Sequence, residues 1–208
     1  MSSITILGSG NMARAIGARA LRGGNTVEIM SRHADDAGAL VRRLGSGATT
    51  GEWGATPSGD VVILAVLAGG AVPVVSGYGE ALAGKIIVDI TNPFNADATG
   101  LAVPHDTSIA QMVAEAAPAS THVVKAFNTL FSHVVAAGDP VDVFMAGDDA
   151  QAKARVAAFI TSLGLRPRDA GALSMAHWLE GAGLLEMGLA RGGLGFNLSL
   201  GIDFAAAA

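Results

Sequence analysis

The sequence contains no cysteine and a single tyrosine among its 208 residues. Without cysteine, disulfides, thiol nucleophiles and cysteine-based metal sites are excluded. The tyrosine, Tyr78, is followed four residues later by Leu82 instead of lysine, which excludes the tyrosine and lysine proton relay of short-chain dehydrogenases. The 5 histidines lack the spacing of a metal-binding set, so we predict no metal site.

Charge is also scarce, because charged residues make up only 15% of the chain and the formal net charge is −5. Lysine and arginine form no cluster, which argues against nucleic acid or an anionic membrane as a partner. The longest apolar stretch, residues 61–75, contains two glycines and a proline and is shorter than the roughly 20 residues that span a bilayer. No signal-peptide pattern opens the sequence. We expect a cytoplasmic protein that acts on a small molecule.

The most informative motif present is a glycine-rich turn near the N-terminus. An apolar run at residues 4–7 leads into Gly8-Ser9-Gly10-Asn11-Met12-Ala13 and then into a helical pattern. Gly8 suits the tight turn out of a strand, and Gly10 leaves room for a pyrophosphate. The helix that begins at Asn11 and Met12 offers free N–H groups and a partial positive charge to phosphates. The motif therefore predicts dinucleotide binding.

The end of the second predicted strand indicates which dinucleotide is bound. An NAD-binding fold usually places Asp or Glu there to accept a hydrogen bond from the ribose 2′-hydroxyl. This chain has Ser31, Arg32 and His33 instead. A hydroxyl, a guanidinium and an imidazole can bind a 2′-phosphate, and no carboxylate is present to repel it. We therefore predict NADP(H) as the cofactor.

Strand and helix patterns alternate along the chain, which is typical of a parallel α/β sheet. We expect strands near 4–7, 27–31, 61–66, 86–90, 122–127, 141–146 and 165–169, and helices near 11–22, 34–44, 72–82, 108–116, 150–162 and 174–190. Residues 48–56 fit a short strand or a loop. The pattern predicts a Rossmann-type, doubly wound parallel sheet over residues 1–170. Thr91 and Asn92 follow a strand at its carboxyl edge, where ligands bind in such sheets, and are candidate cofactor contacts.

The last part of the chain, residues 171–208, is expected to form a small helical and glycine-rich cap. Its helical pattern carries more apolar side chains than a solvated helix needs, namely Leu179, Leu184, Leu185, Met187 and Leu189. These side chains fit packing against the chain's own sheet or a dimer interface that also walls the acceptor pocket, and one surface can do both. We predict a homodimer formed through this segment.

Several further segments carry a resemblance to a known family. They are Asp89-Ile90-Thr91-Asn92-Pro93, Val124-Lys125-Ala126-Phe127-Asn128-Thr129, residues 146–149, 164–165 and 169–171, and the ending Leu200-Gly201-Ile202-Asp203-Phe204. With the glycine turn, they resemble the coenzyme F420-dependent NADP reductases over nearly the whole chain. The resemblance implies a Rossmann domain with a small C-terminal cap, a homodimer, and hydride exchange between NADP(H) and coenzyme F420.

The resemblance also implies roles for particular residues. Ser9, Ser31 and Arg32 would hold the cofactor phosphates. The pair Ala65-Val66 and the turn from Ala126 to Asn128 would flank the nicotinamide, with Asn128 as the candidate catalytic residue that positions the nicotinamide and the acceptor.

Two positions depart from the archaeal members of the family, which carry a histidine at the position of Asn128 and a lysine at that of Asp36. The run from Lys125 to Thr129 is similar to the reductase domain of the six-transmembrane ferrireductases, which pass electrons from NADPH to an ordinary flavin. The acceptor therefore stays open between F420 and FMN or FAD.

We predict an NADPH-dependent oxidoreductase that transfers a hydride between NADP(H) and such a flavin-like acceptor. Few acid or base groups lie near the predicted site, and hydride transfer to a flavin-like ring needs positioning more than proton transfer. One alternative is an NADPH-dependent reductase of a small imine, carbonyl or quinone. Another is a redox sensor that binds NADP(H) without turnover.

Overall fold

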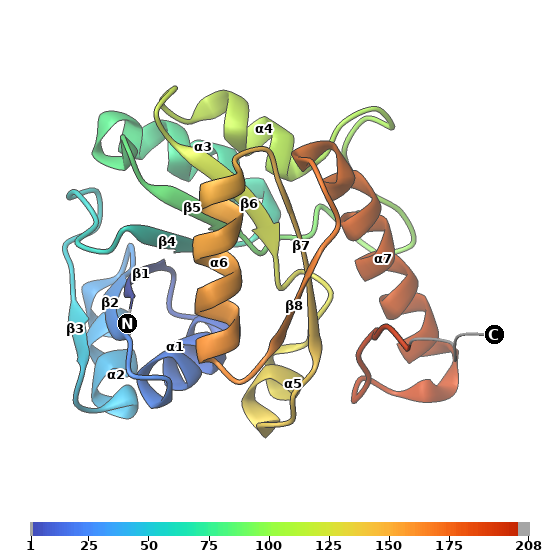
Figure 1. The fold of residues 1–208 in the computed structure, drawn as a ribbon, viewed down its shortest axis with the longest axis horizontal. Coiled ribbons are helices and arrows are strands. Elements are labelled where there is room, and N and C mark those ends of the chain that lie inside the picture. Colours follow the sequence, from blue (N-terminus) through green and yellow to red (C-terminus); the bar gives the residue numbers. More distant parts are fainter. Residues whose placement is uncertain (1, 204–208) are drawn as a thin grey trace.

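The computed structural model describes residues 2–203, so Phe204 of the family-like ending lies outside the described residues (Figure 1). The strands are β1 (Ser3–Leu7), β2 (Thr26–Met30), β3 (Ala48–Thr50), β4 (Val61–Leu64), β5 (Ile86–Asp89), β6 (His122–Ala126), β7 (Asp142–Gly147) and β8 (Arg166–Asp169). The helices are α1 (Asn11–Arg22), α2 (Ala34–Leu44), α3 (Ala68–Tyr78), α4 (Ile109–Ala116), α5 (Ser132–Ala137), α6 (Ala150–Ser162) and α7 (Ala176–Leu189).

All eight strands form one sheet in the order β3-β2-β1-β4-β5-β6-β7-β8. The chain winds outward from β1 in one direction to β2 and β3, and in the other direction from β4 onward. The carboxyl ends of β1 and β4 therefore meet where the winding reverses, which is where ligands bind in open α/β sheets. This arrangement confirms the predicted doubly wound Rossmann-type fold.

One part of the fold prediction was wrong, because the sheet is not parallel throughout. β7 runs antiparallel to β6, with Val124 opposite Gly147, and β8 is parallel to β7. The connection from β6 to β7, residues 127–141, contains the 6-residue helix α5, which the sequence pattern did not reveal. It turns the chain back at the same edge of the sheet.

The apolar core covers both faces of the sheet. In β4, Val61 and Ile63 belong to one cluster of buried side chains, whereas Val62 and Leu64 belong to the other. This alternation is the two-residue period of a strand buried on both faces. Helices α1, α2 and α6 cover the first face, and α3 and α4 cover the second (Figure 1). A site at the sheet edge therefore rests on a rigid scaffold.

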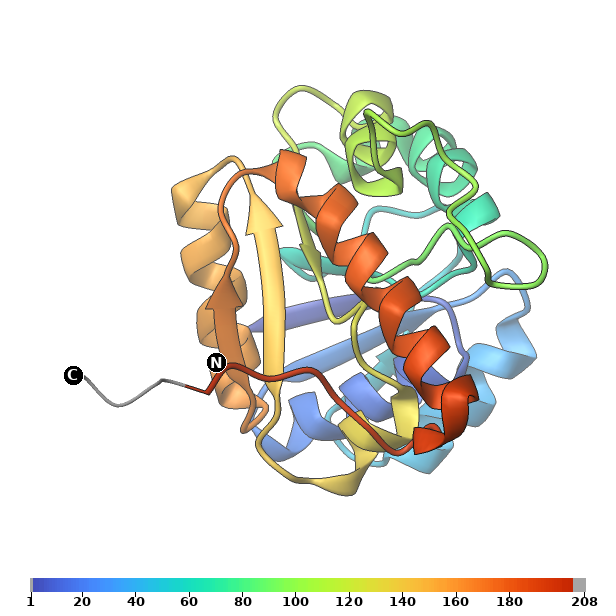
Figure 2. The same cartoon turned by 90° about the vertical axis from the view of Figure 1, so that its right-hand side faces the viewer.

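Helix α7 packs against α4 and β7 and crosses in front of the sheet (Figure 2). The chain after α7 returns across the molecule, where the Ile202 N–H donates to Asp142 Oδ2 at 2.8 Å. The C-terminal segment thus packs on the chain's own sheet, as one of the two interpretations expected. Between residues 2 and 203, no helix is both long and apolar enough to cross a membrane.

Candidate functional site: a groove at the carboxyl edge of the sheet

The glycine turn between β1 and α1 is built as the motif predicts. Gly8 has a φ of 126°, and a Cβ added there would lie 2.2 Å from the carbonyl oxygen of Ala65. Gly8 is therefore required by both the backbone conformation and the close approach of the next loop. At Gly10, in contrast, an added Cβ would have no atom within 4 Å. Gly10 faces open space, where a ligand can approach.

The N-terminus of α1 lacks the features that usually satisfy a helix start. Its N-cap, Gly10, makes no side-chain hydrogen bond, and its first turn contains no acidic residue. By comparison, α4 and α6 are capped by the side chains of Ser108 and Asp149. The first N–H groups of a helix have no partner within it and carry a partial positive charge. The start of α1 is therefore suited to bind an anion.

A groove of about 1270 Å³ runs along this edge of the sheet. Most of the predicted cofactor residues line it, namely Gly8, Ser9, Gly10, Asn11, Met12, Ser31, Arg32, His33, Ala65, Val66, Thr91 and Asn92. These residues come from four connections that follow β1, β2, β4 and β5. The groove is large enough for an extended ligand with groups at both ends.

The β2 end of the groove presents hydroxyl and guanidinium groups. The Oγ atoms of Ser9 and Ser31 lie 3.2 Å apart, and the backbone N–H of His33 donates to Ser31 Oγ at 3.4 Å. Arg32 is exposed, and its guanidinium has no ion-pair partner among residues 2–203. Asp36 lies at the same end and is the one carboxylate that lines the groove there. A free cation beside two hydroxyls is an arrangement that suits a phosphate.

Sequence reasoning missed a wall of the groove formed by the loop after β3 and by α3. Trp53, Gly54 and Tyr78 line this wall, and the Trp53 and Tyr78 rings pack edge to face with centroids 5.4 Å apart. The Gly54 N–H donates to the Tyr78 hydroxyl at 3.0 Å, and burial raises the pKa of Tyr78. The aromatic residues were visible in the sequence, but the course of the loop depends on tertiary contacts.

At the other end of the groove, Thr91 and Asn92 rest on a buried ionic cluster. Lys125 Nζ lies 2.9 Å from Asp89 Oδ2 and 2.8 Å from Glu180 Oε1, and all three side chains are fully buried. The same ammonium donates to the Thr91 carbonyl oxygen at 2.6 Å. Sequence analysis placed Lys125 only within a family-like run and gave Glu180 no role.

Two predicted residues, Ala126 and Asn128, are buried behind the groove and are not among the residues that line it. Asn128 Nδ2 donates to Asn92 Oδ1 at 3.0 Å and to the Leu179 carbonyl oxygen at 2.7 Å. In return, Asn92 Nδ2 donates to the Asn128 carbonyl oxygen at 2.6 Å. Asn128 therefore contacts the groove through Asn92. In the part of the chain that the structure describes, no three His, Asp or Glu residues are placed to hold a metal ion.

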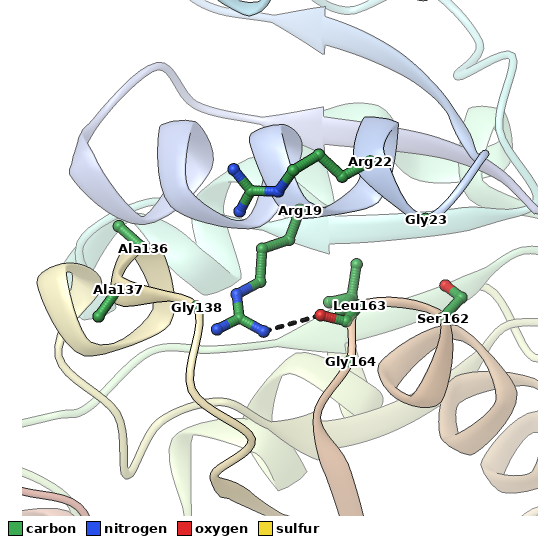
Figure 3. Close-up of a pocket in the computed structure, with 9 residues that line it drawn as sticks. All are labelled: Arg19, Arg22, Gly23, Ala136, Ala137, Gly138, Ser162, Leu163 and Gly164. Carbon is green, nitrogen blue, oxygen red and sulfur yellow. Dashed lines mark hydrogen bonds between the residues drawn. The ribbon is translucent and has the colours of Figure 1, made fainter.

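A smaller hollow of about 380 Å³ lies where α1, α5 and α6 end (Figure 3). Arg19 points into it and donates to the carbonyl oxygens of Leu163 at 2.7 Å and Asp139 at 3.1 Å, and also to that of Val135. Burial lowers the pKa of Arg19. Because its donors are used by the protein itself, we assign Arg19 a structural role.

The fold and the groove define a dinucleotide-binding protein of the NADP type, with an open phosphate turn and no acidic residue at the end of β2. The family model described as NADP oxidoreductase coenzyme F420-dependent matches residues 3–93, which include both of these features and the Thr91–Asn92 edge. The resemblance predicted from the sequence is confirmed over residues 3–93, where the chain is similar to this family.

Individual relatives agree with this family. Metalloreductase STEAP3 of Rattus norvegicus is 33% identical over 181 residues, which cover 85% of this chain and 35% of that protein. The chain thus spans about a third of the length of this relative. A hypothetical protein from Sinorhizobium meliloti is 29% identical, with a TM-score of 0.75 and coverage of 84% of this chain and 87% of its own.

A candidate F420-dependent NADP reductase from Arthrobacter sp. is similar in fold over nearly its whole length. Its TM-score is 0.85 at 24% identity, and the match covers 98% of this chain and 100% of that one. The likeness extends through α7 and the tail, so the Arthrobacter protein shares the fold of the C-terminal segment as well as that of the sheet.

Proposed function

We propose that this protein is an NADPH-dependent oxidoreductase that transfers a hydride between NADP(H) and a flavin-like acceptor, either coenzyme F420 or FMN or FAD. The observation that carries the proposal is the single groove that joins the open start of α1, the free Arg32 guanidinium and the Thr91–Asn92 edge. These features would supply a 2′-phosphate site after β2, a pyrophosphate site after β1 and a nicotinamide site after β5, which is the order in which NADP(H) carries those groups.

The residues of the groove fit NADP(H) in their chemistry. The N–H groups at the start of α1 would bind the pyrophosphate, and Ser9, Ser31 and Arg32 would bind the 2′-phosphate. Ala65 and Val66 on one side and Thr91 and Asn92 on the other would hold the nicotinamide. The bound cofactor supplies the hydride, and the protein contributes binding, orientation and exclusion of water.

The composition of the groove supports a flavin-like acceptor. The residues that line its β4 and β5 side include Val66, Leu67, Ile90, Thr91 and Asn92, none of which titrates near neutral pH. An imine or carbonyl acceptor would need a proton donor in this place. A flavin or deazaflavin ring can take its proton from solvent. Leu67, which is 87% exposed at the lip of the groove, offers apolar surface to a planar ring.

Steady-state oxidation of NADPH tests the proposal, with FMN, FAD, F420, a quinone and a cyclic imine as acceptors. Turnover with one of the flavin-like compounds is the expected result. Turnover with only the imine or the quinone would show that the acceptor is not a flavin-like compound. Tight NADPH binding without any turnover would support a redox sensor. If NADPH does not bind, the proposed function is wrong as a whole.

We also propose that the protein is a homodimer formed through the C-terminal segment. Trp178, Leu185 and Leu189 share one face of α7 and are 66%, 59% and 37% exposed. Leu194 and Phe196, just beyond the helix, are 68% and 47% exposed. Several exposed apolar side chains on one segment are typical of an interface, and a second copy of the chain would cover them symmetrically. Light scattering at micromolar concentration tests this, and a monomer would contradict it.

A further inference from the structure

Lys125 uses every donor of its ammonium group inside the protein. Its three partners are Asp89 Oδ2 at 2.9 Å, the Thr91 carbonyl oxygen at 2.6 Å and Glu180 Oε1 at 2.8 Å. An ammonium has three N–H donors, so none remains for a ligand. The side chain also has no exposed surface. Lys125 can therefore influence the groove only through the residues that it holds.

The residue held most directly is Thr91, which lines the groove. Its N–H donates to Asp89 Oδ1 at 3.0 Å, while its carbonyl oxygen accepts from Lys125. Both backbone groups of Thr91 are thus bound to the same pair of buried charges. A shift of this pair would rotate the Thr91 peptide and move the wall of the groove.

Glu180 connects the buried pair to α7 and α4. Its carboxylate accepts from the N–H groups of Ile109 at 3.2 Å and Ala110 at 3.4 Å, at the start of α4. The partial positive charge of that helix start helps to balance two carboxylates against one ammonium. Burial raises the pKa of Glu180, and the nearby Lys125 opposes this shift. The cluster therefore joins α4, α7 and the edge of the groove.

One turn further along α7, Gly183 lies directly against Asn92. A Cβ added at Gly183 would be 3.0 Å from Asn92 Oδ1, 3.1 Å from Asn92 Nδ2 and 3.3 Å from the Asn128 carbonyl oxygen. Even one methyl group would therefore displace Asn92 or the helix by a few tenths of an ångström. On the same helix, a Cβ added at Gly181 would have no atom within 4 Å.

We propose that α7 sets the position of the Thr91–Asn92 edge, and that Lys125, Glu180 and Gly183 are positioning residues for the nicotinamide end of the groove. The inference rests on the proposed function, because that function assigns the nicotinamide to this edge. Hydride transfer depends steeply on how donor and acceptor are placed, and a misplacement of about 1 Å can cost about 100-fold in rate. Small movements of α7 therefore change turnover.

The pair Gly183→Ala and Gly181→Ala tests the proposal. Both variants replace a helical glycine by alanine, so both gain the same helix propensity. We expect Gly183→Ala to lower kcat by roughly three- to tenfold and to weaken NADPH binding. Binding of adenosine 2′,5′-bisphosphate, which lacks the nicotinamide, should stay unchanged. Gly181→Ala should match the parent protein in all three measurements.

Glu180→Gln provides a second test, since it keeps the shape of the side chain and removes its charge. We expect the same division between lowered kcat and unchanged binding of adenosine 2′,5′-bisphosphate. Identical kinetics of Gly183→Ala and Gly181→Ala, in a protein that binds NADPH, would overturn the inference and leave the proposed function intact. A parent protein that does not bind NADPH would overturn the proposed function instead. If Glu180→Gln does not fold, the glycine pair decides alone.

Discussion

The hydroxyl oxygen of Ser9 lies 3.2 Å from that of Ser31, which brings the phosphate turn and the end of β2 together across 22 positions of sequence. The two hydroxyls come from different connections of the sheet and face the same groove. A phosphate bound beside this pair could accept hydrogen bonds from the hydroxyls and from the neighbouring guanidinium of Arg32. Single substitutions at this end of the groove can therefore test whether the protein prefers NADPH to NADH.

Replacing Arg32 by alanine should change the cofactor preference. A hydrogen bond to a charged group contributes about 1.5–3 kcal/mol, so NADPH affinity should fall by roughly tenfold or more. NADH affinity should hardly change, because NADH has no 2′-phosphate. Arg42→Ala is a matched control, since Arg42 is exposed on α2 and does not line the groove. Equal losses of NADPH and NADH affinity in Arg32→Ala would contradict the assignment.

A branched side chain at Gly10 should block phosphate binding without unfolding the protein. Gly10 has an ordinary φ of −76°, and nothing within 4 Å opposes an added Cβ, so Gly10→Val should keep its circular dichroism spectrum and its melting temperature. Titration with NADPH should show no binding. Gly8→Ala should instead disturb the fold, because its Cβ would collide with the Ala65 carbonyl oxygen. Normal NADPH binding by folded Gly10→Val would show that the phosphates bind elsewhere.

The buried carboxyl of Glu186 should make stability depend on pH. Burial raises the pKa of Glu186 to about 8, and its Oε1 has no hydrogen-bond partner. The folded protein therefore keeps a proton that the unfolded chain loses near pH 4.5, the ordinary pKa of a glutamate. The stabilisation is complete below that pH and is lost as the pH rises to about 8, with a slope of at most about 1.4 kcal/mol per pH unit.

Urea unfolding at pH 5 and pH 8 measures this effect in the parent protein and in Glu186→Gln. The parent should lose more free energy of unfolding between the two pH values than the variant. Some dependence should remain in the variant, because the pKa of Glu180 is also raised by burial. Asp142, whose pKa is lowered to about 2, acts with the opposite sign and only at more acidic pH. The same pH dependence in both proteins would rule out a buried, protonated Glu186.

Removing residues 192–208 should separate cofactor binding from turnover. The deleted segment includes Phe196, whose carbonyl oxygen lies 2.7 Å from His133 Nε2, and Ile202, which donates to Asp142. We expect weaker dimerisation and loss of turnover with flavin-like acceptors, while NADPH affinity stays largely intact. Light scattering and NADPH titration measure these effects, and removal of residues 204–208 alone is the control. Full reductase activity of the shortened protein would refute the prediction.

Much of the fold could be predicted where the sequence pattern is strong and local. Helices α1, α2 and α6 have the predicted bounds. Apolar residues recur with helical spacing in each of them, and a glycine follows within two residues of each helix end. The start of α3 was predicted at residue 72, but the helix begins at Ala68 and includes Pro73. Helix α5 has only 6 residues, too few to show a clear helical periodicity. Because this helix was not predicted, the antiparallel pairing of β7 with β6 was not predicted either.

In the candidate site, too, the parts that follow from local sequence motifs could be predicted and the parts that depend on tertiary packing could not. The glycine turn and the end of β2 are short local motifs, and both of them line the groove. Lys125 and Glu180 are 55 positions apart, and only tertiary packing brings them into contact. Trp53 reaches the groove through a loop whose course no local signal determines. Long-range pairs of this kind leave no periodicity or motif in a single sequence.

Arg19 holds the end of α1 that is distant from the phosphate turn, through three carbonyl oxygens at the ends of α5 and α6. A helix fixed at this end is already in place before a ligand arrives. Binding at its N-terminus then costs little conformational entropy, since the N–H groups need no reordering. The amides of α1 beyond its first turn should consequently exchange slowly with solvent in the free protein. Addition of NADPH should slow exchange mainly in the first turn of α1 and in the loops that border the groove.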